Sequence, residues 1–285
     1  MRNDLLILIL IAVVVLMIAC APAKSTQKTD AMEGMQHGAA MKAHAGNYKS
    51  VDAHLYTIKF NQPAAQTGQE ATLEFKITEK DSQKPITELE IVHEKPMHVV
   101  LVRNDLKHFD HIHPILKDGA WVVGYTFSAA GEYRIWIDFT KDMMQHVVDF
   151  DLSVSGKQEA EEQDKLYGLQ VKFITHEKIQ PNTNVKLDFV VTDSAGKPIP
   201  ITEKFLAANA HLITIDESLK EFEHAHDMNF DNDNVLSFIQ SFSESGKYKA
   251  WVQFYFDGKV RTAPFDFSVS EDMTSQHNME TMGQG

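Results

Sequence analysis

Short runs of alternating apolar and polar residues, rich in Val, Ile, Phe, Tyr and Thr, fill the chain from about residue 48 to residue 271. Turn-forming sequences such as Lys117-Asp118-Gly119 separate the runs. A period of two is typical of half-buried strands, and many short strands without a helical period favour an antiparallel β-sandwich. We therefore expect an all-β protein. In the first half, the expected strands lie near 55–61, 71–78, 86–93, 97–103, 108–113, 120–128, 132–139 and 146–154.

The two halves of this region repeat one another. Residues 97–113, MHVVLVRNDLKHFDHIH, align without a gap on residues 210–226, AHLITIDESLKEFEHAH. Further along, AGEYRIW at 130–136 aligns on SGKYKAW at 245–251. An internal duplication predicts two tandem β-sandwich domains. The expected layout is a signal peptide at 1–19, a flexible tether at 20–47, domains at 48–156 and 165–271 joined by a charged linker at 157–164, and a disordered tail at 272–285.

Three histidines of the first copy fall on one predicted hairpin. A hairpin symmetric about Asp105-Leu106 places His98 opposite His113. His111 lies two residues from His113 and therefore points to the same face of the strand. Directly opposed Cβ atoms are about 4.5–5.5 Å apart, so we expect the three imidazoles to converge.

The second copy predicts the same arrangement. Symmetry about Ser218-Leu219 places His211 opposite His226, and His224 shares their face. A His-x-His strand with a histidine across from it is a compact chelate for Cu²⁺ or Zn²⁺. The alternative is that the rings are core residues kept from a common ancestor, although burying three unpaired polar rings is costly. A one-residue slip in strand register would scatter the rings to opposite faces.

Several methionines lie in segments that are not expected to contribute to a hydrophobic core. Thioethers suit Cu(I) and Ag(I), and histidine adds affinity for Cu(II), so these positions predict capture of a copper ion. In the tether and the tail, the alternative is a linker of biased composition with chance methionines. At the predicted turn, the alternative is a turn that folds back onto the core. The positions are Met32, Met35, His37, Met41 and His44 in the tether, Met273, His277, Met279 and Met282 in the tail, and Met143, Met144 and His146 at a predicted turn.

An apolar run from Leu5 to Ala19 precedes the single cysteine, Cys20. A membrane-spanning helix needs about 20 residues, so the run is short for a span and suits a signal peptide. The string LMIAC resembles the lipobox of bacterial lipoproteins, although Met17 stands where that motif usually has leucine. The resemblance implies palmitate-type lipid on Cys20 and an extracytoplasmic chain anchored to the membrane, at the cell surface or in the periplasm. The alternative, an uncleaved anchor, also places the domains outside the cytoplasm.

Composition narrows the function classes. With 27 Lys and Arg against 40 Asp and Glu, the formal net charge is −13, which argues against a nucleic-acid partner. A blue-copper electron-transfer site needs a cysteine ligand, and no cysteine follows position 20. Nucleophile-elbow, phosphate-loop, dinucleotide and zinc-protease motifs do not occur in the sequence, so we expect no enzyme.

The string KPMHVVLVRNDLKHFDHIHP, with AGEYRIWIDF after it, is similar to the YtkA-like family of secreted or lipid-anchored β-sandwich proteins. The resemblance covers about 97–154 and 210–269, and it implies an immunoglobulin-like or cupredoxin-like fold close to copper-handling proteins. The ends resemble, in composition, those of periplasmic copper and silver resistance proteins. We therefore expect a copper-binding protein for tolerance or delivery, partnered by a copper transporter or an oxidase-assembly protein. The alternatives are a structural or adhesive surface module and a zinc-binding lipoprotein.

Overall fold

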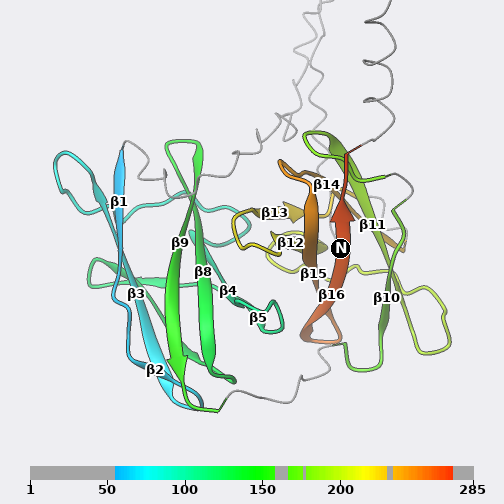
Figure 1. Cartoon of the computed structure of the whole chain (residues 1–285), viewed down its shortest axis with the longest axis horizontal. Coiled ribbons are helices and arrows are strands. Elements are labelled where there is room, and N and C mark those ends of the chain that lie inside the picture. The colour runs from blue at the N-terminus through cyan, green and yellow to red at the C-terminus, as the bar shows by residue number, and fades with distance from the viewer. Residues whose placement is uncertain (1–54, 158–165, 176–177, 230–233, 272–285) are drawn as a thin grey trace, which may run out of the picture. The chain divides into compact units, whose positions relative to one another are not determined.

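The computed structural model describes residues 55–157, 166–175, 178–229 and 234–271, and the regular structure within them is all β-strand (Figure 1). The all-β prediction is therefore confirmed. The predictions for the signal peptide with Cys20, for the tether, for the C-terminal tail and for nearly all of the linker lie outside the described residues. Within the described residues, the structure has no helix of the length and apolarity that a membrane crossing requires.

The first domain consists of two sheets that enclose an apolar core. Apart from the short β2–β9 pair, which is parallel, neighbouring strands are antiparallel. One sheet has the order β1 (Tyr56–Phe60), β3 (Glu70–Glu79), β7 (Ala120–Thr126) and β6 (Ile115–Lys117). The other has the order β2 (Ala65–Gln66), β9 (Met144–Ser155), β8 (Gly131–Lys141), β4 (Met97–Arg103) and β5 (Phe109–Ile112).

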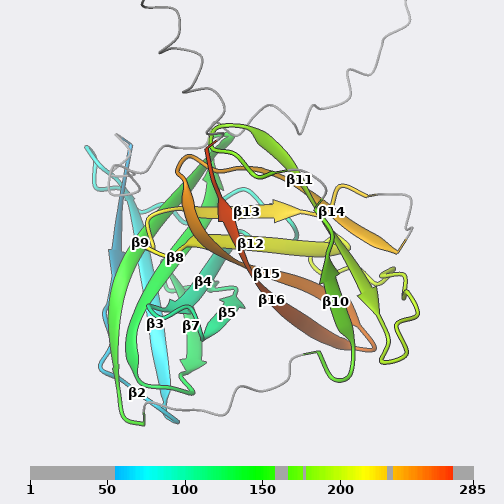
Figure 2. The same cartoon turned by 45° about the vertical axis from the view of Figure 1, so that its right-hand side comes forward.

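The second domain repeats this plan with antiparallel sheets (Figure 2). Its core is formed between the two sheets by residues such as Leu187, Phe238 and Val252. One sheet has the order β10 (Gln170–Phe173), β11 (Asn184–Thr192) and β14 (Val235–Ser241). The other has the order β13 (Phe222–His226), β12 (Ala210–Asp216), β15 (Gly246–Phe256) and β16 (Lys259–Val269).

Strand β4 is buried on both of its faces. In β3, buried and more exposed residues alternate, as expected for a strand with one face in a core. In β4, by contrast, six consecutive residues are buried. Val99 and Leu101 belong to the core of the first domain, whereas Val100 and Val102 belong to a different apolar cluster. Strand β12 shows the same pattern of burial.

That different cluster joins the two domains, and we call it the interdomain apolar cluster. Its two aromatic stacks are related by the repeat: Phe109 stacks on Trp251 with ring centroids 4.6 Å apart, and Phe222 stacks on Trp136 at 5.6 Å. The contact therefore has the self-complementary character of a two-fold interface. The fully buried members are Val100, Val102, Phe109 and Trp136 from the first domain and Ile213, Ile215, Leu219, Phe222 and Trp251 from the second.

The strand expected at 86–93 is the one that the structure contradicts. Instead of a strand, the segment makes only isolated bridges, Glu90 with Thr140 and Val92 with Lys95. Residues His93 and Glu94 have positive φ angles of 48° and 65°, so the chain turns tightly here. Prolines on either side, at 85 and 96, lack the amide hydrogen that a ladder needs.

We expect Phe222→Ala to lower the free energy of unfolding by about 3–5 kcal/mol, because it removes a buried ring from its stack on Trp136. Urea unfolding of the full chain measures the change. Ile239→Ala is the control, since Ile239 is mostly exposed and its removal is expected to cost within about 0.5 kcal/mol. Equal losses in the free energy of unfolding for the two substitutions would show that the interdomain apolar cluster does not stabilise the fold.

Candidate metal centre

Both histidine triads lie on strands that border the interdomain apolar cluster. In the first domain Val99 pairs with Ile112, a register that sets His98 opposite His113. In the second, His211 pairs directly with His226. The predicted registers of both hairpins are therefore confirmed. Because side chains alternate along a strand, the histidines point away from the core of their own domain, on the same side as the apolar cluster.

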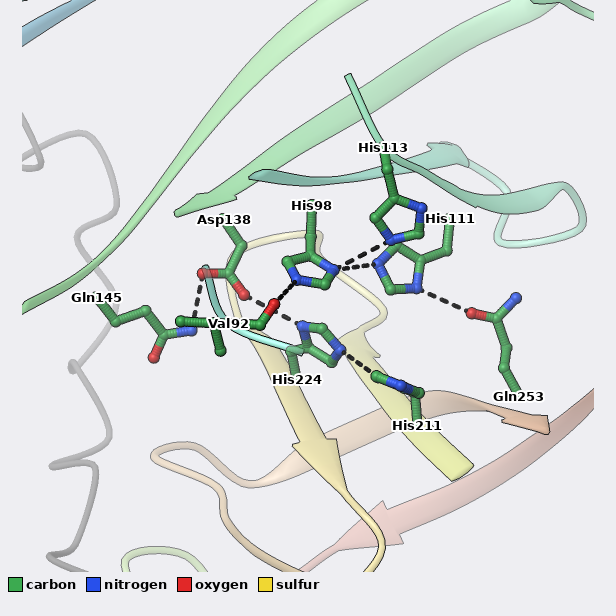
Figure 3. Close-up of polar contacts among 9 residues, drawn as sticks. All are labelled: Val92, His98, His111, His113, Asp138, Gln145, His211, His224 and Gln253. Atoms are coloured by element: carbon green, nitrogen blue, oxygen red, sulfur yellow. Dashed lines mark hydrogen bonds and ion pairs between the residues drawn. The ribbon is translucent and has the colours of Figure 1, made fainter. Parts of the chain in front are cut away.

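The three histidines of the first domain converge (Figure 3). The Nδ1 atom of His98 lies 3.1 Å from Nε2 of His111 and 3.2 Å from Nε2 of His113. Tetrahedral ligand nitrogens bound at ~2.0–2.1 Å lie about 3.3 Å from one another. Both distances to Nδ1 of His98 are therefore close to the separation between two ligands of one ion.

The triad of the second domain repeats the closest of these contacts. The Nδ1 atom of His211 lies 3.1 Å from Nε2 of His224. The ring of His226 lies 4.7 Å from each of the other two rings, measured between centroids. Its Nε2 atom is buried and has no hydrogen-bond partner among the residues that the structure describes. An unsatisfied buried nitrogen calls for a ligand, because it otherwise carries a desolvation cost.

The outer nitrogens of His98 and His211 fix which tautomer each ring adopts. The Nε2 atom of His98 lies 3.1 Å from the carbonyl oxygen of Val92, and that of His211 lies 2.8 Å from the carbonyl oxygen of Phe205. A carbonyl only accepts, so both Nε2 atoms carry the hydrogen and donate it. The Nδ1 atoms, which face the other histidines, are therefore bare.

The central histidine of each triad is fixed in the same way, but by the other domain. The Nδ1 atom of His111 donates to Oε1 of Gln253 at 3.0 Å, and that of His224 donates to Oδ2 of Asp138 at 3.1 Å. Gln253 is oriented by its amide nitrogen, which donates to Thr262 at 3.2 Å. The Nε2 atoms of His111 and His224 are therefore bare as well.

In each domain, then, two bare nitrogens face one another at 3.1 Å. Neither has a hydrogen to donate to the other, so the two lone pairs repel. In the first domain, Nε2 of His113 also lies 3.2 Å from Nδ1 of His98 and is able to donate to it. Histidines that ligate metals usually donate their other N–H to a carbonyl or a carboxylate, which is the pattern found here. The outer hydrogen bonds therefore orient these nitrogens toward one another, in an arrangement that is able to hold an ion.

Burial keeps the rings neutral. Desolvation lowers the pKa of His113 and of His211 to about 3. Burial, and then the neighbouring histidines, hold the pKa of His111, His224 and His226 well below the ordinary value. Neutral imidazole is the form that binds metals, so these rings need not lose a proton to bind an ion near neutral pH.

The two triads form one continuous cluster. Ligand nitrogens of His98, His111 and His224 lie within 4.8 Å of one another, and so do those of His211, His224 and His226. His224 therefore stands within reach of both sets. The sequence predicts two separate triads, whereas the structure brings them together across the domain contact.

Three neighbours of the triads were missed from the sequence: His93, Asp138 and Gln253. The ring of His93 stacks on that of His226, with centroids 3.4 Å apart. Asp138 and Gln253 occupy equivalent places in the repeat, in the strings IDF and VQF. Polar residues at matching buried positions, one residue before a core phenylalanine, were the signal that could have identified them.

The predicted group at the β8–β9 turn is not brought together. His146 is 4% exposed, and its ring packs against those of Phe139 and Tyr56, each with centroids 5.1 Å away. Met143 is 92% exposed, and Met144 is also exposed. The turn therefore follows neither interpretation: His146 packs inward, but the two methionines neither approach it nor fold back onto the core. The predicted ligands of the tether and the tail lie outside the described residues.

Fold and site together define a tandem β-sandwich protein with histidine clusters on the facing sheets of its domains. The chain belongs to the DUF8832 family, described as a domain of unknown function, whose model matches residues 49–156 and 164–271. It therefore carries this domain twice. The similarity to the YtkA-like family stays a prediction. None of the curated proteins matches the chain.

Solved structures match the chain only distantly. A Salmonella α2-macroglobulin reacted with methylamine is 11% identical over 75% of this chain and 14% of that protein, with a TM-score of 0.27. An Escherichia coli α2-macroglobulin activated by porcine elastase gives 11% identity over 76% and 20%, with a TM-score of 0.26. The ICAM-5 D1–D4 ectodomain fragment gives 9% over 75% and 53%, with a TM-score of 0.25. These scores carry no argument about function.

We expect the metal-free protein to lose stability as the pH falls from about 6.5 towards 3. The unfolded chain binds protons on its histidines in this range, whereas His113 and His211 stay neutral in the fold down to a pKa of about 3. Each imidazole that stays neutral in the fold lowers the free energy of unfolding by ~1.4 kcal/mol for each unit by which the pH falls. Burial raises the pKa of Glu223 to about 8, so the folded chain binds one proton there before the unfolded chain does. This single group adds stability as the pH falls and opposes the loss from the histidines.

Urea unfolding at several pH values, with chelator present, measures this dependence. His113→Gln removes one of the neutral rings and is expected to give a shallower slope than the unsubstituted chain. A profile that is flat between pH 6.5 and 4.5, or the same slope in both proteins, would contradict the buried neutral imidazoles.

Proposed function

We propose that the protein binds metal ions through the histidine triads of its two domains. The observation that carries this proposal is the pair of bare nitrogens in each domain, 3.1 Å apart and held by outer hydrogen bonds to Val92, Gln253, Phe205 and Asp138. A packing role needs no such alignment, because rings that only fill space gain from donating to one another. The role is one of binding, with no catalytic step.

Copper is the ion that the whole sequence favours. Imidazole suits copper in both oxidation states, and the thioethers of the tether and the tail suit Cu(I). The end segments would capture the ion and the triads would hold it, on a chain anchored outside the cytoplasm through lipid on Cys20. Such a protein serves copper tolerance, or delivery to a copper transporter or an oxidase-assembly protein.

Zinc is the second candidate, for a structural reason. Three neutral imidazole nitrogens with a fourth position open are a common set of zinc ligands. The described part of the chain has four methionines: Met143, Met144 and Met228 are exposed, and Met97 belongs to the core of the first domain. A structural or adhesive surface module remains the alternative in which the histidines bind nothing.

We expect His111→Ala and His224→Ala together to lower the affinity for Cu(I), Cu(II) and Zn²⁺ by at least tenfold, because each removes the central nitrogen of a triad. Competition against chelators of known affinity, with the full chain, gives the values. His108→Ala is the matched control, since its position on the hairpin points it to the opposite face from His111. Unchanged affinity in the double variant would favour the surface module.

We expect replacement of the end-segment methionines by leucine to weaken Cu(I) and Ag(I) binding while leaving Zn²⁺ binding unchanged, because thioethers are soft ligands. The substituted positions are Met32, Met35, Met41, Met273, Met279 and Met282. The same competition assay compares the three ions. Zinc bound more tightly than Cu(I), with no effect of the leucines, would make this a zinc-binding protein.

A further inference from the structure

We infer that the two triads form a single two-ion centre in which each domain positions the central ligand of the other, and that the ion held by His211, His224 and His226 is bound more tightly. This inference rests on the proposed function. It adds the number of ions, their unequal affinities, and a dependence of metal binding on the contact between the domains.

The outer hydrogen bonds cross between the domains. His224 of the second domain donates to Asp138 of strand β8 in the first domain. His111 of the first domain donates to Gln253 of strand β15 in the second domain. The other outer bonds, from His98 to Val92 and from His211 to Phe205, stay within one domain. The central ligand of each triad is therefore oriented only while the domains are in contact.

The two crossing acceptors differ in charge, and this makes the sites unequal. Asp138 is 6% exposed, and its other carboxylate oxygen accepts from the amide of Gln145 at 2.9 Å. Among the described residues, the group of cationic type that lies within ion-pair distance of Asp138 is His224, whose ring is kept neutral by burial. Burial also raises the pKa of Asp138. A buried carboxylate without a compensating positive charge is costly.

An ion on His224 supplies that charge through the imidazole. The carboxylate also makes the ring a stronger ligand, as acidic neighbours of metal-bound histidines generally do. Gln253 orients His111 in the same way but brings no charge.

The paired nitrogens are 3.1 Å apart in both triads, so the pairs differ mainly in the charge of the acceptor. The third histidines differ as well, since Nε2 of His113 lies 3.2 Å from Nδ1 of His98 whereas Nε2 of His226 has no hydrogen-bond partner among the described residues. We assign the difference in affinity to the charge of the acceptor, which the variants below change.

The test titrates the full chain with Zn²⁺, against chelators that resolve two binding steps. A separate titration with Cu(I) uses the chain whose six end-segment methionines are replaced by leucine, so that only the triads are compared. The unsubstituted chain is expected to bind two ions in two steps. His226→Ala is expected to remove the tighter step and His113→Ala the weaker one, which assigns each step to a triad. Circular dichroism of each variant establishes that it is folded.

Asp138→Asn keeps the size of the side chain and removes its charge. We expect it to weaken the tighter step by about 10–100-fold, the usual effect of losing such a neighbour, and to leave the weaker step unchanged. Gln253→Glu is the reciprocal variant and is expected to tighten the weaker step. It keeps the inference testable if Asp138→Asn fails to fold. Asp118→Asn, at an exposed turn, is the charge-matched control.

The outcomes separate the inference from the function on which it rests. Binding of a single ion per chain would overturn the two-ion centre and leave metal binding intact. The same conclusion would follow if two ions bound with affinities that neither Asp138→Asn nor Gln253→Glu changed. An unsubstituted chain that binds neither Zn²⁺ nor Cu(I) would overturn the proposed function as well.

Discussion

The two aromatic stacks between the domains, Phe109 on Trp251 and Phe222 on Trp136, are the contact on which the rest of the molecule depends. They close the outer face of β4 and of β12, so each strand is buried from both sides. That burial withdraws the neighbouring histidines from water and keeps them neutral. It also brings Asp138 and Gln253 within hydrogen-bond distance of rings that belong to the other domain.

The part of the fold that depends on local patterns could be predicted from the sequence. The hairpin register follows from the turn at Asp105-Leu106, because a symmetric turn leaves few ways to pair the strands. The repeat then transfers the result to the second copy. The prediction of a strand at 86–93 was wrong because the segment has the Ile, Val and Thr content of a strand, whereas nothing in its composition indicates the positive φ angle at its end. The same turn places the Val92 carbonyl against His98.

The contact between the domains could not be predicted in this way, because two faces of similar composition give no local sign that they meet. One indication was present. The apolar run Val99-Val100-Leu101-Val102 in β4 does not alternate, and a strand with one wet face would. Without the contact, the triads are two separate chelates and the roles of Asp138, Gln253 and His93 have no explanation.

The covalent joining of the two copies has a consequence of its own. A single-domain protein would make the same contact only by dimerising, with an occupancy that depends on its concentration. In one chain the partner is present at an effective concentration in the millimolar range. The contact then persists however few copies a cell holds. Identical subunits must also carry identical residues, whereas a duplicated chain is free to place aspartate on one side and glutamine on the other. Duplication thus turns a symmetric surface into a pair of sites that can differ in affinity.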